Sequence, residues 1–177
     1  MNDYSLQPFS INSCLSDLKL TANIVRHTNT LAICYTLIGN LAELMILAPA
    51  DLPACKDELW EETCFEFFLA LKQSPHYWEF NLSPAGHWNV YRFAAYRQGM
   101  QAEMAFQLLP FRVQTQPGCL SLALELDLTK IVPIDQALEV AISTVIKPRD
   151  GEVSYWALTH PGSQADFHHR DSFIVEL

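Results

Sequence analysis

The sequence predicts an all-β fold, a β-sandwich of about ten strands with short turns. Three observations lead to this prediction. Hydrophobic side chains recur at every second position, turn residues separate the hydrophobic runs, and no run shows the 3.6-residue spacing of a capped amphipathic helix. The chain has 177 residues, of which 50% are hydrophobic, and it shows neither repeats nor a linker. We therefore expect a single domain over residues 1–177.

The strand-like runs follow one another closely along the chain. Residues 31–37 alternate between large apolar side chains and smaller or polar ones, and Gly39-Asn40 separates them from residues 41–46. This arrangement predicts a hairpin at residues 31–46. The other runs that predict strands are residues 18–24, 59–71, 77–82, 88–96, 100–108, 120–128, 138–146, 153–159 and 172–177.

Charge and composition exclude several classes of protein. The chain contains eleven Lys and Arg residues and 20 Asp and Glu residues, so its net charge is -9. This negative charge argues against a nucleic-acid partner. The longest stretch without these residues, 27–42, is shorter than the ~20 apolar residues of a membrane span. The first twenty residues show no signal peptide, so we expect a cytoplasmic protein. Five cysteines without a CxxC pair indicate reduced thiols, neither disulfides nor structural zinc.

The alternation within residues 59–71 and 77–83 predicts a surface of unusual composition. If the two runs pair antiparallel, their apolar side chains share one face and their polar side chains share the other. The polar face then carries Cys64, Glu66, Glu79, Asn81 and Ser83, with Trp60 near its edge. Two carboxylates, an amide and a tryptophan with no basic residue make this face a candidate for ligand binding.

Two other interpretations of this face remain open. Glu66 and Glu79 could be solvated on an outer sheet face, or paired there with Arg92 or Arg97. Two carboxylates on neighbouring strands could also serve as the acid and the base of a glycoside hydrolase, although the sequence does not set their separation.

The C-terminal part of the sequence is rich in potential metal ligands. His160, Asp166, His168 and His169 carry imidazole and carboxylate groups that suit zinc, iron or copper. A surface loop with hydrogen-bonded histidines explains the same residues, since no HExxH-type spacing is present. The chain lacks a GxSxG elbow, a GxGxxG motif and a P-loop, and a mid-strand Cys64 is typically an inert thiol. We therefore expect a protein that is not an enzyme.

Four segments resemble a known family. They are LWEETCFEFF at residues 59–68, YWEFNLSPAGHW at 77–88, YRFAAYR at 91–97, and the tail at 155–173 with YWAL, HP and DFHH. Together they resemble DOMON-like domains, which are related to the family 9 carbohydrate-binding modules, and the tail is similar to that of a small bacterial branch. The resemblance covers residues 31–177. It implies an immunoglobulin-like or jelly-roll β-sandwich that binds a ligand without catalysis.

The resemblance also implies where a ligand would lie. In the related modules a sugar rests on a sheet surface between two aromatic rings, while acids, amides and an arginine hold its hydroxyl groups. Trp60, six residues before Glu66, matches one such ring and its acidic neighbour, and Trp156 or Trp88 matches the second. The residues that we expect to bind a saccharide or a similar small polar ligand are Trp60, Glu66, Glu79, Asn81, Arg92, Trp88 and Trp156, with His160 and His168 near the rim.

Other ligands are conceivable for this family. A haem would need axial ligands, for which the candidates are Met45, Met100 or Met104 with His160 or His168. A divalent metal could use Glu66 with the C-terminal histidines and Asp166. The polar face favours a saccharide over haem. An exposed sheet edge could instead bind a protein partner with no small ligand, and the oligomeric state is left open.

Overall fold

The computed structural model describes residues 3–10 and 15–177, and within these ranges the strands confirm the predicted all-β class. The described helices are three-residue 3₁₀ segments, Leu41–Glu43, Leu59–Glu61 and Arg170–Ser172. The strands are β1 (Asp3–Pro8), β2 (Lys19–His27), β3 (Thr30–Ile38), β4 (Cys64–Leu71), β5 (Tyr77–Leu82), β6 (Trp88–Phe93), β7 (Gln101–Ala102), β8 (Phe111–Gln116), β9 (Cys119–Asp127), β10 (Leu138–Ile146), β11 (Ser154–Ala157) and β12 (Val175–Glu176).

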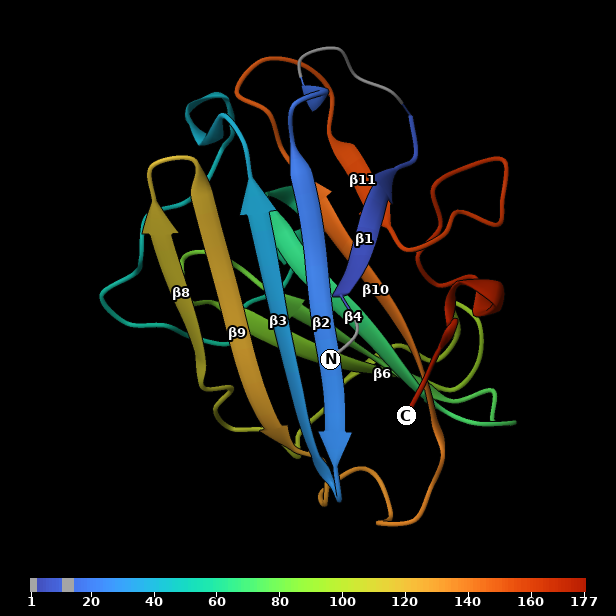
Figure 1. The fold of residues 1–177 in the computed structure, drawn as a ribbon. Coiled ribbons are helices and arrows are strands. Elements are labelled where there is room, and N and C mark those ends of the chain that lie inside the picture. Colours follow the sequence, from blue (N-terminus) through green and yellow to red (C-terminus); the bar gives the residue numbers. More distant parts are fainter. Residues whose placement is uncertain (1–2, 11–14) are drawn as a thin grey trace.

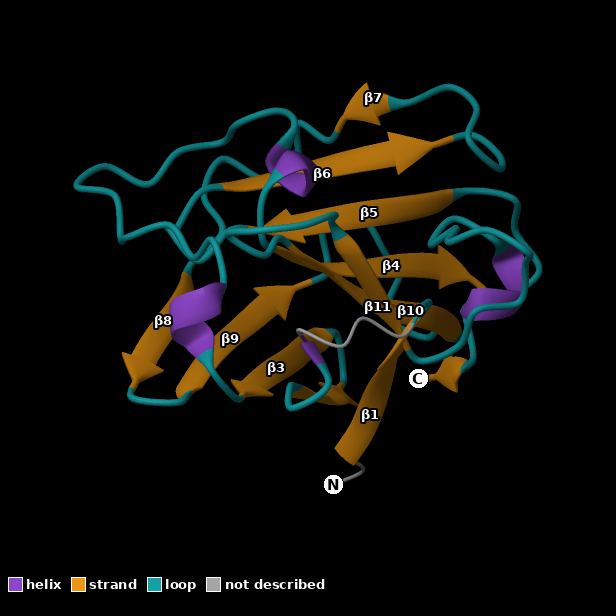
Figure 2. Ribbon diagram, turned by 90° about the horizontal axis from the view of Figure 1, so that it is seen from above, coloured by secondary structure: helices purple, strands orange, loops and turns teal. Residues whose placement is uncertain are grey.

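These strands pair antiparallel in one continuous sheet that curls back on itself (Figures 1 and 2). The order is β7-β6-β5-β4-β10-β11-β1-β2-β3-β9-β8, and β12 pairs with β10. We call β2, β3, β9 and β8 the front half and β10, β4, β5 and β6 the rear half. The two halves face each other across the hydrophobic core. Strand β1 links them, because it pairs with β2 through residues 3–6 and with β11 through Gln7 and Pro8.

The front half shows the alternation of a sheet with one buried face. In β3, the side chains of Leu31, Ile33, Tyr35 and Leu37 are at most 2% exposed, while the residues between them are half-buried or exposed. Strand β3 pairs over its whole length with β2 and with β9. The inward residues of the three strands therefore line up as one apolar surface.

Strand β4 differs because it is buried on both faces. Phe65, Phe67 and Leu69 point into the core between the two halves. Glu66 and Phe68 point the opposite way, yet they are buried as well. Their face is covered by a segment before β4 and by the C-terminal part of the chain, and this cover turns the outer face of the rear half into an enclosed site.

Aromatic contacts and one hydrogen bond join the two halves behind β4. The fully buried Tyr35 of β3 reaches across the core, where its hydroxyl donates a hydrogen bond of 2.7 Å to the backbone oxygen of Glu66. Its ring lies 5.2 Å from that of Phe65, and Phe67 stacks on Phe80 at 4.4 Å. The backbone position of Glu66 is thus set from the front half.

The predicted hairpin after residue 38 is wrong. Residues 41–43 form a 3₁₀ segment, and the buried Leu44 makes an isolated bridge with Pro148. The reason is that the free edge of β3 is taken by β9, a strand far along the chain, so no position remains there for a local partner. Gly39, at φ 146°, lets the chain turn away from the sheet.

Strand lengths also differ from the prediction between residues 100 and 116. Only Gln101–Ala102 of the predicted run at 100–108 pairs, and it does so with β6. Strand β8 was not predicted, because its residues are largely polar and only Phe111 and Val113 are half-buried. As an edge strand, β8 needs little apolar surface of its own.

The cysteines within the described ranges are free thiols: Cys34 and Cys55 are exposed, Cys64 is buried and Cys119 is half-buried. Cys14 lies outside the described residues. In the same ranges, no helix is both long and apolar enough to cross a membrane.

Removing the Tyr35 hydroxyl should weaken the joint between the two halves. We expect Tyr35→Phe to lower the free energy of unfolding by about 1–3 kcal/mol, since the Glu66 carbonyl loses a buried donor. Denaturant unfolding measures this change. Tyr4→Phe, on a half-buried residue of β1, is the control, and a stability loss as small as that of the control would contradict the role given to Tyr35.

Candidate ligand-binding pocket

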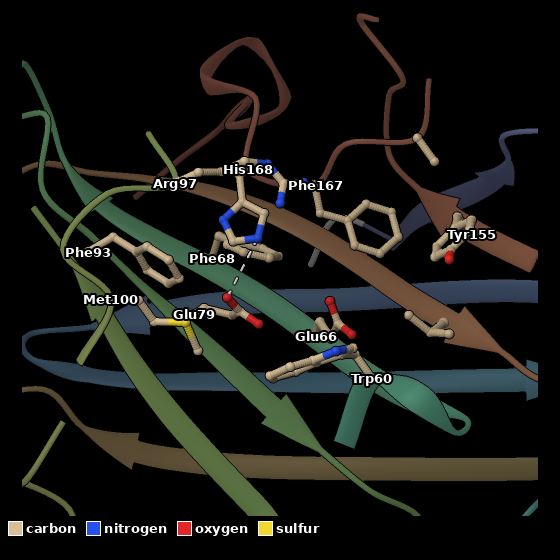
Figure 3. Close-up of a pocket in the computed structure, with 12 residues that line it drawn as sticks. Trp60, Glu66, Phe68, Glu79, Phe93, Arg97, Met100, Tyr155, Phe167 and His168 are labelled. Carbon is tan, nitrogen blue, oxygen red and sulfur yellow. Dashed lines mark ion pairs between the residues drawn. The ribbon is translucent and has the colours of Figure 1, made fainter. Parts of the chain in front are cut away.

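A cavity of about 470 Å³ lies on the face of the rear half that is turned away from the core (Figure 3). Its apolar wall is mainly aromatic and comes from elements far apart in the sequence. Trp60 precedes β4, Phe68 lies on β4, Phe93 ends β6, Tyr155 lies on β11, and Phe167 belongs to the loop after β11. The polar groups of the cavity are Glu66, Glu79, Arg97 and His168.

The register of the rear half places a polar row under this cavity. Ser143 pairs with Glu66, Glu66 with Asn81, and Asn81 with Asn89, so these side chains cross four adjacent strands on one face. All four are buried. The next row, Ala141, Phe68, Glu79 and Tyr91, brings the second carboxylate beside the first. The face predicted from alternation alone therefore exists.

Three polar atoms of the first row have no hydrogen-bond partner in the structure. They are Ser143 Oγ, Glu66 Oε1 and Asn89 Oδ1. A buried polar atom without a partner is unfavourable, and native structures contain few of them. Of these three residues, Glu66 lines the cavity, where its carboxyl group lies next to the ring of Trp60 (Figure 3).

Burial raises the pKa of both carboxyl groups. Glu66 is 3% exposed, and desolvation, together with the negative charge of Glu79, raises its pKa well above the usual value. Desolvation raises the pKa of Glu79 to about 7, although Asn81 Nδ2 donates to Glu79 Oε1 at 2.8 Å. Near neutral pH, Glu79 is therefore partly protonated, whereas an exposed glutamate would have lost its proton.

His168 closes the cavity from the side opposite the strands. Its ring packs edge-on against Phe68 and Phe93 at 5.0 and 5.1 Å. Its Nδ1 lies 2.9 Å from the Tyr77 hydroxyl, and its Nε2 lies 3.7 Å from Glu79 Oε2, the contact drawn in Figure 3. Desolvation, with the nearby charge of Arg97, lowers the pKa of His168 to about 4. A neutral His168 gives Glu79 no positive partner.

Asp166 holds the rim of the cavity in place. Its carboxylate accepts hydrogen bonds from Arg97 Nη2 at 2.8 Å, from the Tyr96 hydroxyl at 2.5 Å and from the backbone N–H of His168 at 3.1 Å. The backbone of Arg97 is left-handed, at φ 51°, and its N–H donates to the Tyr77 hydroxyl. One carboxylate thus ties the loop after β11 to the turn after β6.

The structure brings five of the predicted residues together. Trp60, Glu66, Glu79 and His168 line the cavity, and Asn81 lies beneath it as a donor to Glu79. Their role in binding a ligand stays a prediction.

Trp88 and Trp156, predicted as alternatives for the second aromatic ring, lie on the other face. Both are buried in the core between the two halves, at 4% and 5% exposure. The reason is parity: Trp156 follows Tyr155 on β11, and only one of two consecutive strand residues can face the cavity. Tyr155 is the residue that does so. The resemblance therefore points to Trp156 where the structure has Tyr155 at the cavity.

Arg92 and His160 also lie away from the cavity. Arg92 pairs across strands with Trp78, on the opposite face from Glu79, and donates to Gln101 Oε1. His160 Nε2 lies 2.8 Å from the backbone oxygen of Gln7. The arginine at the cavity is instead Arg97, which the sequence offered only as a possible partner of Glu66 or Glu79 and which pairs with Asp166. It lies in a turn, so no strand alternation indicates its position.

The residues present do not fit a haem or a metal centre. Met100 and His168 both line the cavity, but Tyr77 and Glu79 face the two ring nitrogens of His168, and the floor is carboxylic rather than apolar. Met104 is 81% exposed. Across the described ranges, no three histidine, cysteine or acidic side chains are grouped closely enough to hold a metal ion.

Comparison with known proteins relates this chain to others by fold. No family model matches the sequence, and no curated protein matches it. A crystal structure from Bacteroides uniformis ATCC 8492, described as a "putative carbohydrate-binding protein", superposes with a TM-score of 0.69 at 12% identity, covering 96% of this chain and 84% of the other. A family 9 carbohydrate-binding module from Caldicellulosiruptor kristjanssonii, in complex with cellotriose, gives 0.54 at 9% identity, covering 92% and 74%. At these identities the similarity concerns the fold.

The raised pKa of Glu79 should make the free energy of unfolding depend on pH. Between pH 4.5 and about 7 the folded protein holds a proton that an unfolded glutamate releases, so this group lowers stability as pH rises. His168 acts in the opposite direction below its usual pKa, so the comparison is made with Glu79→Gln. We expect the stability gain of this variant over wild type to grow by up to about 3 kcal/mol between about pH 5 and about pH 8.

Denaturant midpoints at both pH values measure this difference. Glu125→Gln, on an exposed residue of β9, serves as the control and should track wild type. A gain for Glu79→Gln that is the same at both pH values would show that Glu79 has an ordinary pKa.

Loss of Asp166 should loosen the rim without unfolding the sheet. Asp166→Ala removes the acceptor shared by Arg97, Tyr96 and the His168 N–H. We expect hydrogen exchange of the amides at residues 165–168 to speed up by about tenfold or more, with strand amides unchanged. Asp171→Ala, on an exposed acid nearby, is the matched control, and equal exchange in both variants would contradict the anchoring role.

Proposed function

We propose that this protein is a non-catalytic binding module that holds a saccharide in the cavity of the rear half. The observation that carries the proposal is the pairing of the half-buried Trp60 ring with the buried, unpartnered Oε1 of Glu66 inside a 470 Å³ cavity. A sugar presents an apolar C–H face and a rim of hydroxyls, which calls for an aromatic plate beside hydrogen-bonding groups.

The cavity suits a ligand of the size of one or two sugar rings. Ligand sites typically measure about 300–1,000 Å³ and are mostly apolar with a few polar groups. Here the aromatic wall includes Trp60, Tyr155 and Phe167, and the polar groups lie on the floor and at one rim. Ser143, next to Glu66 in the polar row, and Asn89, at the other end of the row beyond Asn81, each carry a further unpartnered oxygen beneath the floor.

The positions of the carboxyl groups favour binding over hydrolysis. In glycoside hydrolases two carboxyl groups flank the scissile bond. Glu66 and Glu79 instead lie side by side on adjacent strands of one floor. Among the described residues, the facing loop directs into the cavity one group of acid–base character, the neutral His168, so we infer that a ligand is held rather than cleaved.

The family, the fold type, the origin and the location of the protein are part of the same proposal. We assign the chain to the DOMON-like relatives of the family 9 carbohydrate-binding modules, with a jelly-roll β-sandwich fold, a bacterial origin and a cytoplasmic location. The fold similarity to a module crystallised with cellotriose supports the first part of this assignment. The motifs of residues 59–68 and 77–88 support it independently.

A thermal-shift and calorimetric screen against mono- and disaccharides tests the proposal. A saccharide that binds the folded state raises the unfolding midpoint by mass action. We expect Trp60→Ala to weaken binding of any such saccharide by about tenfold or more, which corresponds to about 1.4 kcal/mol. Trp60→Phe, which keeps an aromatic plate, should retain part of the affinity.

A matched pair of arginine variants checks the location of the site. Arg97→Ala removes the rim group, whereas Arg92→Ala removes an exposed arginine on the other face. Only Arg97→Ala should reduce binding. Loss of binding in Arg92→Ala, or full binding in Trp60→Ala, would place the ligand elsewhere.

A further inference from the structure

Among the described residues, no lysine or arginine forms an ion pair with either carboxyl group of the cavity floor. Of the described residues that line the cavity, only Arg97 is a permanent cation, and its guanidinium is bound to Asp166 at 2.8 Å. The imidazole of His168 is neutral near pH 7. Glu66 and Glu79 are therefore both buried, and the groups of the described residues nearest to Glu79 are the Asn81 amide and the neutral imidazole of His168.

The other titratable groups around the floor add no further positive charge. Strand β4 contributes Cys64, a buried thiol of raised pKa, and β6 contributes Tyr91, whose pKa is raised as well. Strand β5 adds the Tyr77 phenol, and the loop after β11 adds Asp166, which is a further anion. Every titratable group around the floor other than Arg97 is thus neutral or negative near pH 7.

The walls above the floor are suited to a cation. A positive charge is attracted to the face of an aromatic ring, most strongly to tryptophan, and more so where water is excluded. Trp60, Tyr155 and Phe167 line the cavity, and Trp60 lies directly beside Glu66 (Figure 3). Aromatic walls over a carboxylic floor form a site in which an ammonium group meets opposite charge below and ring faces at the sides.

We propose that the preferred ligand is an amino sugar, whose protonated amine lies over Glu66 and Glu79 while its ring packs on Trp60. This inference rests on the proposed saccharide function and specifies the class of saccharide that is bound. The unpartnered Glu66 Oε1 would gain a charged donor, and Glu79 would gain the positive partner that His168 does not supply. A neutral sugar forms no ion pair with either carboxyl group, so the site favours the amine over it.

A proton balance accompanies this binding. Burial raises the pKa of Glu79 to about 7, so in the free protein this carboxyl group is partly protonated near neutral pH. An ammonium ion favours the ionised carboxylate, so binding displaces that proton from Glu79 to the buffer. Affinity for the amino sugar should therefore fall when the pH drops to about 5, where Glu79 is protonated. A neutral sugar lacks this dependence.

The decisive experiment compares glucosamine, glucose and N-acetylglucosamine by calorimetry at about pH 7. These sugars differ at one position, which carries an ammonium, a hydroxyl or a neutral amide. We expect glucosamine to bind at least about tenfold more tightly than either of the others, a difference of about 1.4 kcal/mol. Ethanolamine, an amine without a sugar ring, should bind more weakly than glucosamine because it cannot pack on Trp60.

Variants that keep the shape of the floor separate charge from packing. Glu79→Gln and Glu66→Gln should each reduce the preference for glucosamine over glucose by about tenfold, whatever their effect on the affinity for glucose itself. Glu125→Gln, on the exposed side of β9, is the matched control and should keep the preference. Thermal unfolding of each variant confirms that it is folded before the titration.

The outcomes are distinct. Equal affinity for glucose and glucosamine, or a preference that survives in both glutamine variants, overturns the amino-sugar proposal and leaves saccharide binding standing. Ethanolamine binding as tightly as glucosamine overturns the saccharide part and leaves an amine site. Binding of none of the three sugars overturns the amino-sugar proposal, and the proposed function is overturned only if the wider screen of mono- and disaccharides also shows no binding.

Discussion

The hydrogen bond from Tyr35 to the backbone of Glu66 joins the two functions of strand β4. On the core side, the carbonyl of Glu66 is held by a phenol that comes from the front half. On the other side, the carboxyl group of the same residue lies at the centre of the cavity floor. The packing of the core therefore determines the position of the group that a ligand would meet, and the site needs no loop to place its floor.

The floor is an unfavourable arrangement in energetic terms. Burying a carboxyl group raises its pKa and lowers stability at neutral pH, and two adjacent carboxyl groups add repulsion. Apolar residues at the positions of Glu66 and Glu79 would extend the second hydrophobic cluster, which already includes Phe68, Tyr77 and Phe93. The presence of polar groups within an otherwise aromatic layer indicates that this layer has a role other than stability.

The sequence predicts which residues of a strand share a face, but it does not predict which strands pair with one another. Strict alternation placed Glu66, Glu79 and Asn81 on one surface, because a strand has only two faces and the neighbouring run was joined by a short turn. The fate of residues 41–46 could not be predicted, since it depended on β9 occupying the edge of β3 from 80 residues away in the chain. Long-range strand order is not encoded in local pattern.

Within the site, the misplaced residues share one physical cause. The resemblance points to the right segments, but Trp156 is one position from the cavity-facing Tyr155, and in a strand one position changes the face. Trp88 also lies on the core face of its strand. Tyr155 could have been found by counting parity from Ser143 and Val145 across β10 and β11, once that pairing was known. Arg97 could not, because a left-handed turn residue follows no periodicity.

The loop that carries Phe167 and His168 determines when, during synthesis of the chain, the cavity can form. The floor consists of strands that end at residue 93, with β10 and β11 added later, whereas the wall opposite comes from the last part of the chain, held down by Asp166. During synthesis at a ribosome, strands β4, β5 and β6 emerge well before this wall. The cavity is therefore incomplete until residues 165–168 have been made, and a ligand can be enclosed only after that point.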